Sequence, residues 1–326
     1  MSGSIAALVA GCTSREAMVP PDSKSGARFE WVVLDGERLV LKYQDARDDW
    51  FMRATGDLDG RRFARLWESG LLGAVPDVID HAVVGAAVEG RVGAILLRDV
   101  SDWLLPLGDV RFGREEHLRF LVHMAALHAR FWGWADDVGL TSLPARYLMF
   151  SPAVAEAERA RGSSPLVPKV MAEGWRRFPL VAPRAAAVVL PLLEDPGPLV
   201  GALAQVPHTL VHGDWKAANL GIDRRGRTIL LDSGEVPGEA SPLADLCWYL
   251  ALNAACLPES KDDTIAAYRS ALEARGVSTS PWWEEALALE LLATLVQFGW
   301  EKALGGPGAE LEWWEGWAIR GAGLLR

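Results

Sequence analysis

A polar loop followed by a short hairpin constrains the fold of this chain more than any other feature. The apolar segment Thr209–Val211 runs into the polar loop His212–Asn219. Two further apolar segments follow with the turn Asp223–Gly226 between them, and the second one ends at Asp232. Apolar runs on either side of a glycine-containing turn predict a β-hairpin. Because a hairpin brings its two ends together, we expect Asn219 and Asp232 to face one site.

The polar side chains of this stretch are suited to phosphoryl transfer. Asp232 and Asn219 offer the hard oxygen ligands that magnesium prefers when it binds together with substrate phosphates. Asp214 lies five residues before Asn219, beside the expected metal, where it can orient a hydroxyl group and take its proton. Lys216 can neutralise charge on the group being transferred. The four residues together predict a phosphotransferase site.

A second hairpin is predicted near the N-terminus. The segments Phe29–Leu34 and Arg38–Tyr43 are rich in valine, leucine and aromatic residues, and Asp35-Gly36 lies between them. An Asp-Gly pair at this place is a strong signal for a tight turn, because glycine accepts the positive φ angle that the turn requires. Lys42 is therefore expected near the end of a strand.

The rest of the chain divides into a sheet-rich part and a helical part. A loop over 13–28 is expected to lie over a ligand, 58–72 to form one amphipathic helix, and 92–97 to form a buried strand. We place the boundary between an N-terminal lobe, 1–99, and a C-terminal lobe, 100–326, directly after that strand. The C-terminal lobe is expected to be mainly helical. Its clearest helical patterns cover 115–132, 243–256, 262–274, 282–304 and 311–324.

The motif resembles that of a known family. His212-Gly213-Asp214 with Asn219 five residues later, and an apolar strand that ends in Asp232, is similar to the signature of the aminoglycoside phosphotransferase and choline kinase family. This family is related to the protein kinases. The resemblance implies an α+β, two-lobed protein-kinase-like fold, with an N-terminal antiparallel sheet lobe and a mainly helical C-terminal lobe. It also implies ATP as the donor, Mg²⁺, and a small-molecule hydroxyl as the acceptor.

The resemblance assigns a role to each matching residue. Asp214 is the expected catalytic base, and Asn219 and Asp232 are the expected metal ligands. Lys42 is expected to contact the α- and β-phosphates of ATP. Lys216 resembles the lysine that protein kinases carry in the same loop.

Two further expectations follow from the family pattern. Asp245, in the family's Asp-Leu position, is expected to be a buried partner of the loop backbone. His212 is expected to shape the same loop through backbone hydrogen bonds and not to act as a base.

The sequence departs from the family pattern around the expected nucleotide site. The family pairs the strand lysine with a glutamate in the following helix, and Glu68 is the only acid well inside that helix here, so we assign it to Lys42. An aromatic residue commonly follows the metal aspartate, whereas Ser233-Gly234 follows it here. These departures leave a pseudokinase, a nucleotide-binding protein with impaired catalysis, as an alternative.

The loop expected over the phosphates also differs from the usual pattern. It has no Gly-x-Gly-x-x-Gly motif, but Ser23, Ser25 and Gly26 can offer hydroxyl and backbone amide groups to phosphate. Ser25, and Asp99 at the lobe boundary, are therefore assigned to cofactor binding.

Net charge restricts the class of ligand. The 326 residues carry a formal net charge of −10, which is the wrong sign for general nucleic-acid binding. A cationic or neutral small molecule fits better, with an aminoglycoside-type acceptor favoured and choline, an amino acid or a sugar as alternatives. The acids that we assign to a cationic acceptor are Glu235, Glu239 and Glu301.

Cysteine usage and hydropathy bear on location. Cys12, Cys247 and Cys256 form no Cys-x-x-Cys pair, so a reducing cytoplasm is expected. Residues 8–12 read like a lipoprotein cleavage box, but the preceding apolar run is short and without positive charge, so an ordinary first strand is expected there. No run of 18 apolar residues predicts a membrane span or a membrane partner. The oligomeric state stays open.

A metal-dependent hydrolase is the other enzyme class that the motif permits. In that case His212, Asp214 and Asp232 would be the metal ligands. The chain has no Gly-x-Ser-x-Gly, His-Glu-x-x-His or Walker motif, so the commoner hydrolase and P-loop classes have no support.

Overall fold

The hairpin at Asp35-Gly36 forms the middle of an antiparallel sheet in the computed structural model, which describes residues 3–20, 24–162 and 165–325. β2 (Arg28–Leu34) pairs with β3 (Glu37–Gln44), and the turn residues have φ angles of 52° and 80°. Two positive φ angles are typical of the primed turn that matches strand twist. The sheet has the order β1-β2-β3-β6-β5. Its other strands are β1 (Ser14–Met18), β5 (Val83–Glu89) and β6 (Val92–Arg98).

One face of this sheet is closed by apolar side chains and the other carries Lys42. Leu39, Leu41 and Tyr43 of β3 pack in a small cluster with Val32. Because side chains alternate across a strand, Lys42 lies on the opposite face, toward the rest of the molecule. The segment expected as a first strand is instead a short helix, α1 (Ile5–Leu8), since the preceding serine caps it by accepting a backbone hydrogen bond.

The helix predicted over 58–72 is shorter than expected. α3 spans Arg62–Glu68, because the carboxylate of Asp57 accepts hydrogen bonds from the backbone N–H groups of Arg61 and Arg62, at 3.1 and 3.2 Å, and fixes its start. The sequence pattern also missed α2 (Trp50–Ala54), which Asp49 caps.

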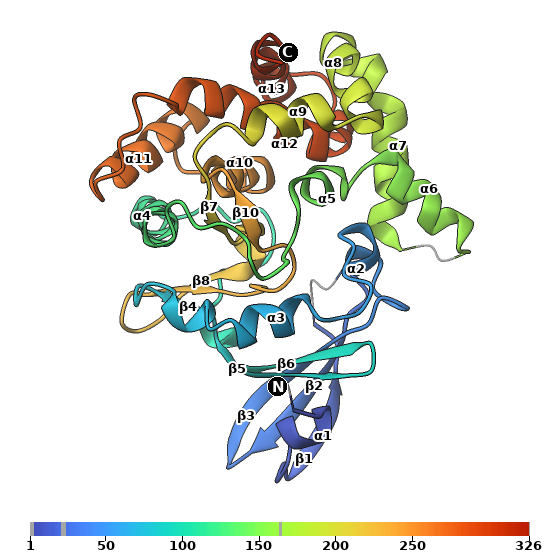
Figure 1. Ribbon diagram of the computed structural model, residues 1–326, viewed down its shortest axis with the longest axis vertical. Coiled ribbons are helices and arrows are strands. Elements are labelled where there is room, and N and C mark those ends of the chain that lie inside the picture. Colours follow the sequence, from blue (N-terminus) through green and yellow to red (C-terminus); the bar gives the residue numbers. More distant parts are fainter. Residues whose placement is uncertain (1–2, 21–23, 163–164, 326) are drawn as a thin grey trace.

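The C-terminal part is mainly helical, as expected (Figure 1). At its centre lies α12 (Trp283–Gly305), which is buried along most of its length and packs against α7 (Leu166–Val181) and α13 (Ala309–Ala322). Among the described residues, no single helix is long and apolar enough to cross a membrane, although α8 and α9 pass that test as a pair bent by 91°. The helices are α4 (Arg114–Arg130), α5 (Leu143–Leu148), α6 (Pro152–Ala160), α7 (Leu166–Val181), α8 (Pro183–Glu194), α9 (Gly197–Leu203), α10 (Leu243–Leu252), α11 (Lys261–Glu273), α12 and α13 (Ala309–Ala322).

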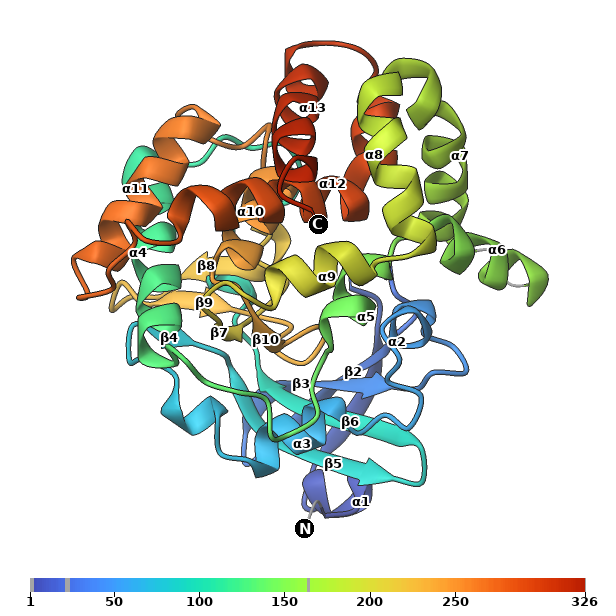
Figure 2. The same cartoon turned by 45° about the horizontal axis from the view of Figure 1, so that its top comes forward.

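Two small sheets lie between the large sheet and the helices (Figures 1 and 2). β7 (Thr209–Val211) pairs with β10 (Gly238–Ala240). The hairpin predicted from the sequence is β8 (Leu220–Ile222) with β9 (Thr228–Leu230), and β4 (Ile79–Asp80) joins β9 in parallel. The loops after β7 and β9 therefore face the sheet that carries the lysine.

Candidate active site

The loop after β7 is held in shape by two buried side chains of the helical part. The carboxylate of Asp245 accepts hydrogen bonds from the backbone N–H groups of His212 and Gly213, at 2.8 and 2.6 Å, and contacts the ring of His128. Further along the same loop, the backbone N–H of Ala217 donates to Oδ1 of Asn253 at 2.7 Å. Burial alone would raise the pKa of Asp245, but these hydrogen bonds and the nearby histidine lower it. A buried, charged Asp245 therefore fixes the loop.

His212 is turned toward the loop itself. Its Nδ1 accepts a hydrogen bond from the backbone N–H of Asp214 at 3.2 Å, and burial lowers the pKa of its ring. Within the described part of the chain, no three His, Cys, Asp or Glu side chains are grouped to hold a metal ion. The arrangement matches the loop-shaping role expected for His212 and gives no support to the hydrolase alternative.

Asp214 is buried, and three donors surround its carboxylate. Oδ2 accepts from Nζ of Lys216 at 2.9 Å and from Nδ2 of Asn219 at 2.7 Å. Oδ1 accepts from Nε1 of Trp248 at 3.1 Å. Burial alone would lower the pKa of Lys216, but the nearby carboxylates of Asp214 and Asp232 raise it, so the lysine is held in its charged form. The orientation of the Asp214 carboxylate is thus fixed from both sides.

Asn219 and Asp232 lie at the two ends of the hairpin, as the sequence predicted. The backbone carbonyl of Asn219 accepts from the N–H of Leu231 at 2.9 Å, which ties the two ends together. Since Nδ2 of Asn219 donates to Asp214, its Oδ1 is the atom that can bind a cation. Burial alone would raise the pKa of Asp232, but Lys42 and Lys216 lower it, so its carboxylate is charged. An amide oxygen and a carboxylate are ligands that suit magnesium.

Lys42 reaches this site from the large sheet. Its Nζ lies 2.9 Å from Oδ1 of Asp232 and also contacts Glu235, and its side chain is only 4% exposed. Burial alone would lower the pKa of Lys42, but the two carboxylates raise it. Lys42, Asp232, Lys216 and Asp214 therefore form one charged network across the junction of the sheet and the helical part.

Comparisons with known proteins identify the fold. A scan against models of protein families gives no match, and a search of curated proteins gives none. Among solved structures, the choline kinase LicA from Streptococcus pneumoniae matches with a TM-score of 0.52 at 12% identity, over 98% of this chain and 96% of that one. A microcompartment-associated aminopropanol kinase matches with a TM-score of 0.52 at 13% identity, over 97% and 93%. The chain has the protein-kinase-like fold. The expected fold is thereby confirmed.

One expected contact of the kinase-like fold is made by a different residue. Glu68 was assigned to Lys42, but it is the last residue of α3 and is exposed. The ammonium of Lys42 instead contacts Asp232 and Glu235. The assignment of Glu68 was therefore wrong, because α3 turns Arg62 and not an acid toward this loop.

The residues assigned to the phosphate-covering loop and to the lobe boundary have neighbours of their own. Oγ of Ser25 accepts from the backbone N–H of Ala27 at 3.2 Å, and its carbonyl accepts from the N–H of Trp50 in α2. Asp99 pairs with Arg38 and accepts from the N–H and the hydroxyl of the serine two residues on. Their roles in cofactor binding stay predictions. Ser23 lies outside the described residues.

The acids assigned to a cationic acceptor are engaged elsewhere. Glu235 contacts Lys42, and Glu239 contacts the ring of His208 at 2.9 Å and a backbone N–H. Glu301 lies 2.9 Å from Lys302 on α12. None of the three thereby gains support as an acceptor ligand.

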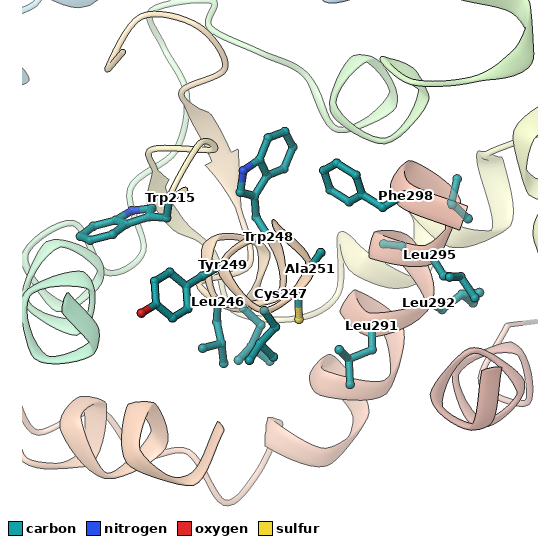
Figure 3. Packing of buried hydrophobic residues seen from close by; sticks show 14 of the residues in the cluster. Trp215, Leu246, Cys247, Trp248, Tyr249, Ala251, Leu291, Leu292, Leu295 and Phe298 are labelled. Atoms are coloured by element: carbon teal, nitrogen blue, oxygen red, sulfur yellow. The ribbon is translucent and has the colours of Figure 1, made fainter. Parts of the chain in front are cut away.

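Sequence reasoning missed Trp248, which lies against the expected base. It belongs to α10 and packs edge-on against Phe298, with ring centroids 4.9 Å apart (Figure 3). The available signal was its position three residues after Asp245, because residues three apart share one face of a helix. A residue on that face of α10 is directed toward the same loop that Asp245 binds.

Proposed function

We propose that the protein transfers the γ-phosphate of ATP, with Mg²⁺, to a hydroxyl group of a small molecule. One observation supports this most. The carboxylate of Asp214 accepts hydrogen bonds from Asn219 and Lys216. The charge of Lys216 also interacts with that of Asp232, which pairs with Lys42. These are the groups that phosphoryl transfer needs, and the fold brings Lys42 to a stretch, 214–232, that lies far from it in the sequence.

Each side chain has a distinct task in this mechanism. Asp214 accepts the hydrogen bond of the acceptor hydroxyl and takes its proton as the oxygen attacks the γ-phosphorus and ADP leaves. Lys42 pairs with the α- and β-phosphates, and Lys216 neutralises charge on the phosphoryl group in transit. Asn219 and Asp232 would hold Mg²⁺, which supplies charge neutralisation for the phosphate oxygens when it is bound.

The acceptor is proposed from charge and from the two solved kinases. The chain has a net charge of −10, which favours a cationic partner. Those kinases are named for choline and aminopropanol, and both molecules join a hydroxyl to a cationic nitrogen. We keep aminoglycosides first, on the resemblance of the sequence motif, and place small amino alcohols such as these second, followed by amino acids and sugars. The three cysteines are free, which suits a reducing cytoplasm.

A two-stage experiment tests the proposed function. A thermal-shift screen with Mg²⁺ and a non-hydrolysable ATP analogue selects acceptors from aminoglycosides, amino alcohols, amino acids and sugars. Transfer of labelled γ-phosphate to the selected acceptors is then measured for the wild type and for Asp214→Asn. We expect the substitution to lower kcat by roughly 10²- to 10⁴-fold with near-normal nucleotide affinity, because it removes the base and leaves the nucleotide contacts.

The exposed Asp137 provides a matched control. Asp137→Asn makes the same chemical change at an exposed side chain outside the hydrogen-bonded network and should keep wild-type transfer. Full turnover by Asp214→Asn would remove Asp214 from the role of base. Tight nucleotide binding without transfer to any acceptor would favour the impaired pseudokinase instead.

A further inference from the structure

We propose that Glu235 is the residue that positions Lys42 for the nucleotide, in place of an acid from α3. The inference rests on the proposed function. The two groups form a buried hydrogen-bonded ion pair, with exposed fractions of 4% for the lysine and 8% for the glutamate side chain. Asp232 is the other carboxylate on the ammonium, and it is also an expected metal ligand. Glu235 therefore keeps Lys42 directed into the site when Asp232 binds the metal.

The backbone of Glu235 is held from two sides by buried arginines. Nη1 of Arg62, in α3, donates to the carbonyl of Glu235 at 2.7 Å. Nη2 of Arg146, in α5, donates to the carbonyl of the next residue, Val236, at 2.6 Å. Both arginines are nearly fully buried. A carboxylate on a backbone fixed in this way is preorganised for one partner, since few alternative positions are open to it.

The two departures from the family sequence pattern complement each other here. A Cβ atom on Gly234 would lie 2.1 Å from Cδ2 of Phe63, a residue of α3. Only glycine therefore fits where this ring packs on the loop after Asp232. α3 thus presents an aromatic ring to the metal-aspartate loop, and the loop presents an acid to the strand lysine. The resemblance implies an acid in the helix and an aromatic residue in the loop, whereas here α3 supplies the ring and the loop supplies the acid.

This arrangement changes what controls the lysine. When the acid belongs to the helix, movement of the helix makes or breaks the ion pair. Here Asp232 and Glu235 belong to one short loop, and the backbone N–H of Glu235 donates to the carbonyl of Asp232 at 3.1 Å. The lysine contact and the metal ligand are therefore set by the same loop, and α3 contacts that loop through Arg62 and Phe63.

Direct measurement of nucleotide affinity tests the inference without an acceptor. Binding of a non-hydrolysable ATP analogue with Mg²⁺ is measured by calorimetry for the wild type, Glu235→Gln and Glu68→Gln. We expect Glu235→Gln to weaken binding by about tenfold or more, because it removes one partner of a buried charge pair. Glu68→Gln makes the same change at the exposed end of α3 and should stay within about twofold of the wild type. The opposite order of the two variants would overturn the inference.

A double-mutant cycle separates positioning of Lys42 from a general structural role. In a Lys42→Met background, Glu235→Gln should cause no further loss of affinity, because its partner is already absent. A full additional loss in that background would contradict the inference. If Glu235→Gln unfolds below the assay temperature, Glu235→Asp, which keeps the charge but is one methylene shorter, takes its place in the same cycle.

The result also distinguishes this inference from the proposed function. A wild type that binds no nucleotide would overturn both. A wild type that binds nucleotide tightly, with an affinity that Glu235→Gln leaves unchanged, would overturn only the role of Glu235. With an active acceptor, Glu235→Gln should raise KM for ATP more than it lowers kcat, whereas Asp214→Asn should mainly lower kcat.

Discussion

Replacing Trp248 by phenylalanine isolates one of the hydrogen bonds that orient the expected base. The substitution removes the indole N–H that donates to Oδ1 of Asp214 at 3.1 Å. It keeps an aromatic ring against Phe298. The two donors on Oδ2, Lys216 and Asn219, are unchanged. Asp214 therefore keeps two of its three donors but loses the contact that fixes its second oxygen.

The size of the effect follows from the type of hydrogen bond. A hydrogen bond to a charged group contributes about 1.5–3 kcal/mol, and a contact of 3.1 Å is long enough to favour the lower value. If that free energy holds the carboxylate in its reactive orientation, kcat falls by about tenfold, since about 1.4 kcal/mol corresponds to a factor of ten. Nucleotide affinity should stay unchanged, because Lys42 and Asp232 are untouched.

The assay compares kcat and nucleotide affinity of Trp248→Phe with those of Trp300→Phe. Trp300 packs on Phe150, as Trp248 does, and its Nε1 has no hydrogen-bond partner among the residues that the structure describes. Trp300→Phe removes the same atoms without removing a hydrogen bond and should keep kcat near the wild-type value. Equal losses of kcat in the two variants would refute the reasoning, because the effect would then come from packing alone.

Three further predictions concern stability. Burial raises the pKa of Glu290 to about 8. Between about pH 4.5 and 8 the folded state therefore keeps a proton on Glu290 that the unfolded state has released. The free energy of unfolding should thus fall as pH rises through this range. Glu290→Gln should therefore gain about 4 kcal/mol over the wild type in urea unfolding at pH 8 and nothing at pH 4; an equal gain at both pH values would contradict this. Arg53→Met should cost about 3 kcal/mol, because it breaks the buried ion pair between Arg53 and Glu158, and a double-mutant cycle with Glu158→Gln should show the coupling; additive losses would refute it. Gly234→Ala should lower the free energy of unfolding by about 1–3 kcal/mol, since its Cβ overlaps a phenylalanine ring, and an unchanged melting temperature would argue against that close contact.

The parts of the fold that the sequence predicted are those with local signals. Asp35-Gly36 fixes the β2–β3 hairpin, and with it the strand position of Lys42, within a few residues. The hairpin between Asn219 and Asp232 likewise depends on one turn with a glycine. Helical patterns located α4 and α10 to α13 because their apolar residues repeat over nearly three turns or more.

The parts that the sequence did not predict depend on contacts between distant segments. The partner of Lys42 lies 193 residues away, and nothing local to either residue shows that Glu235 and not Glu68 meets the ammonium. α3 is shorter than its apolar pattern because the side chain of Asp57 sets its start. Such contacts appear only when the tertiary structure is known.

The most direct test of the account is a crystal structure with Mg²⁺ and a non-hydrolysable ATP analogue. The account predicts that Asn219 and Asp232 bind the metal and that Lys42 contacts the α- and β-phosphates while it stays paired with Glu235. Asp214 should then face the γ-phosphate from the acceptor side. A nucleotide bound away from the junction of the sheet and the helical part, or a metal held by other residues, would contradict the proposed phosphotransferase.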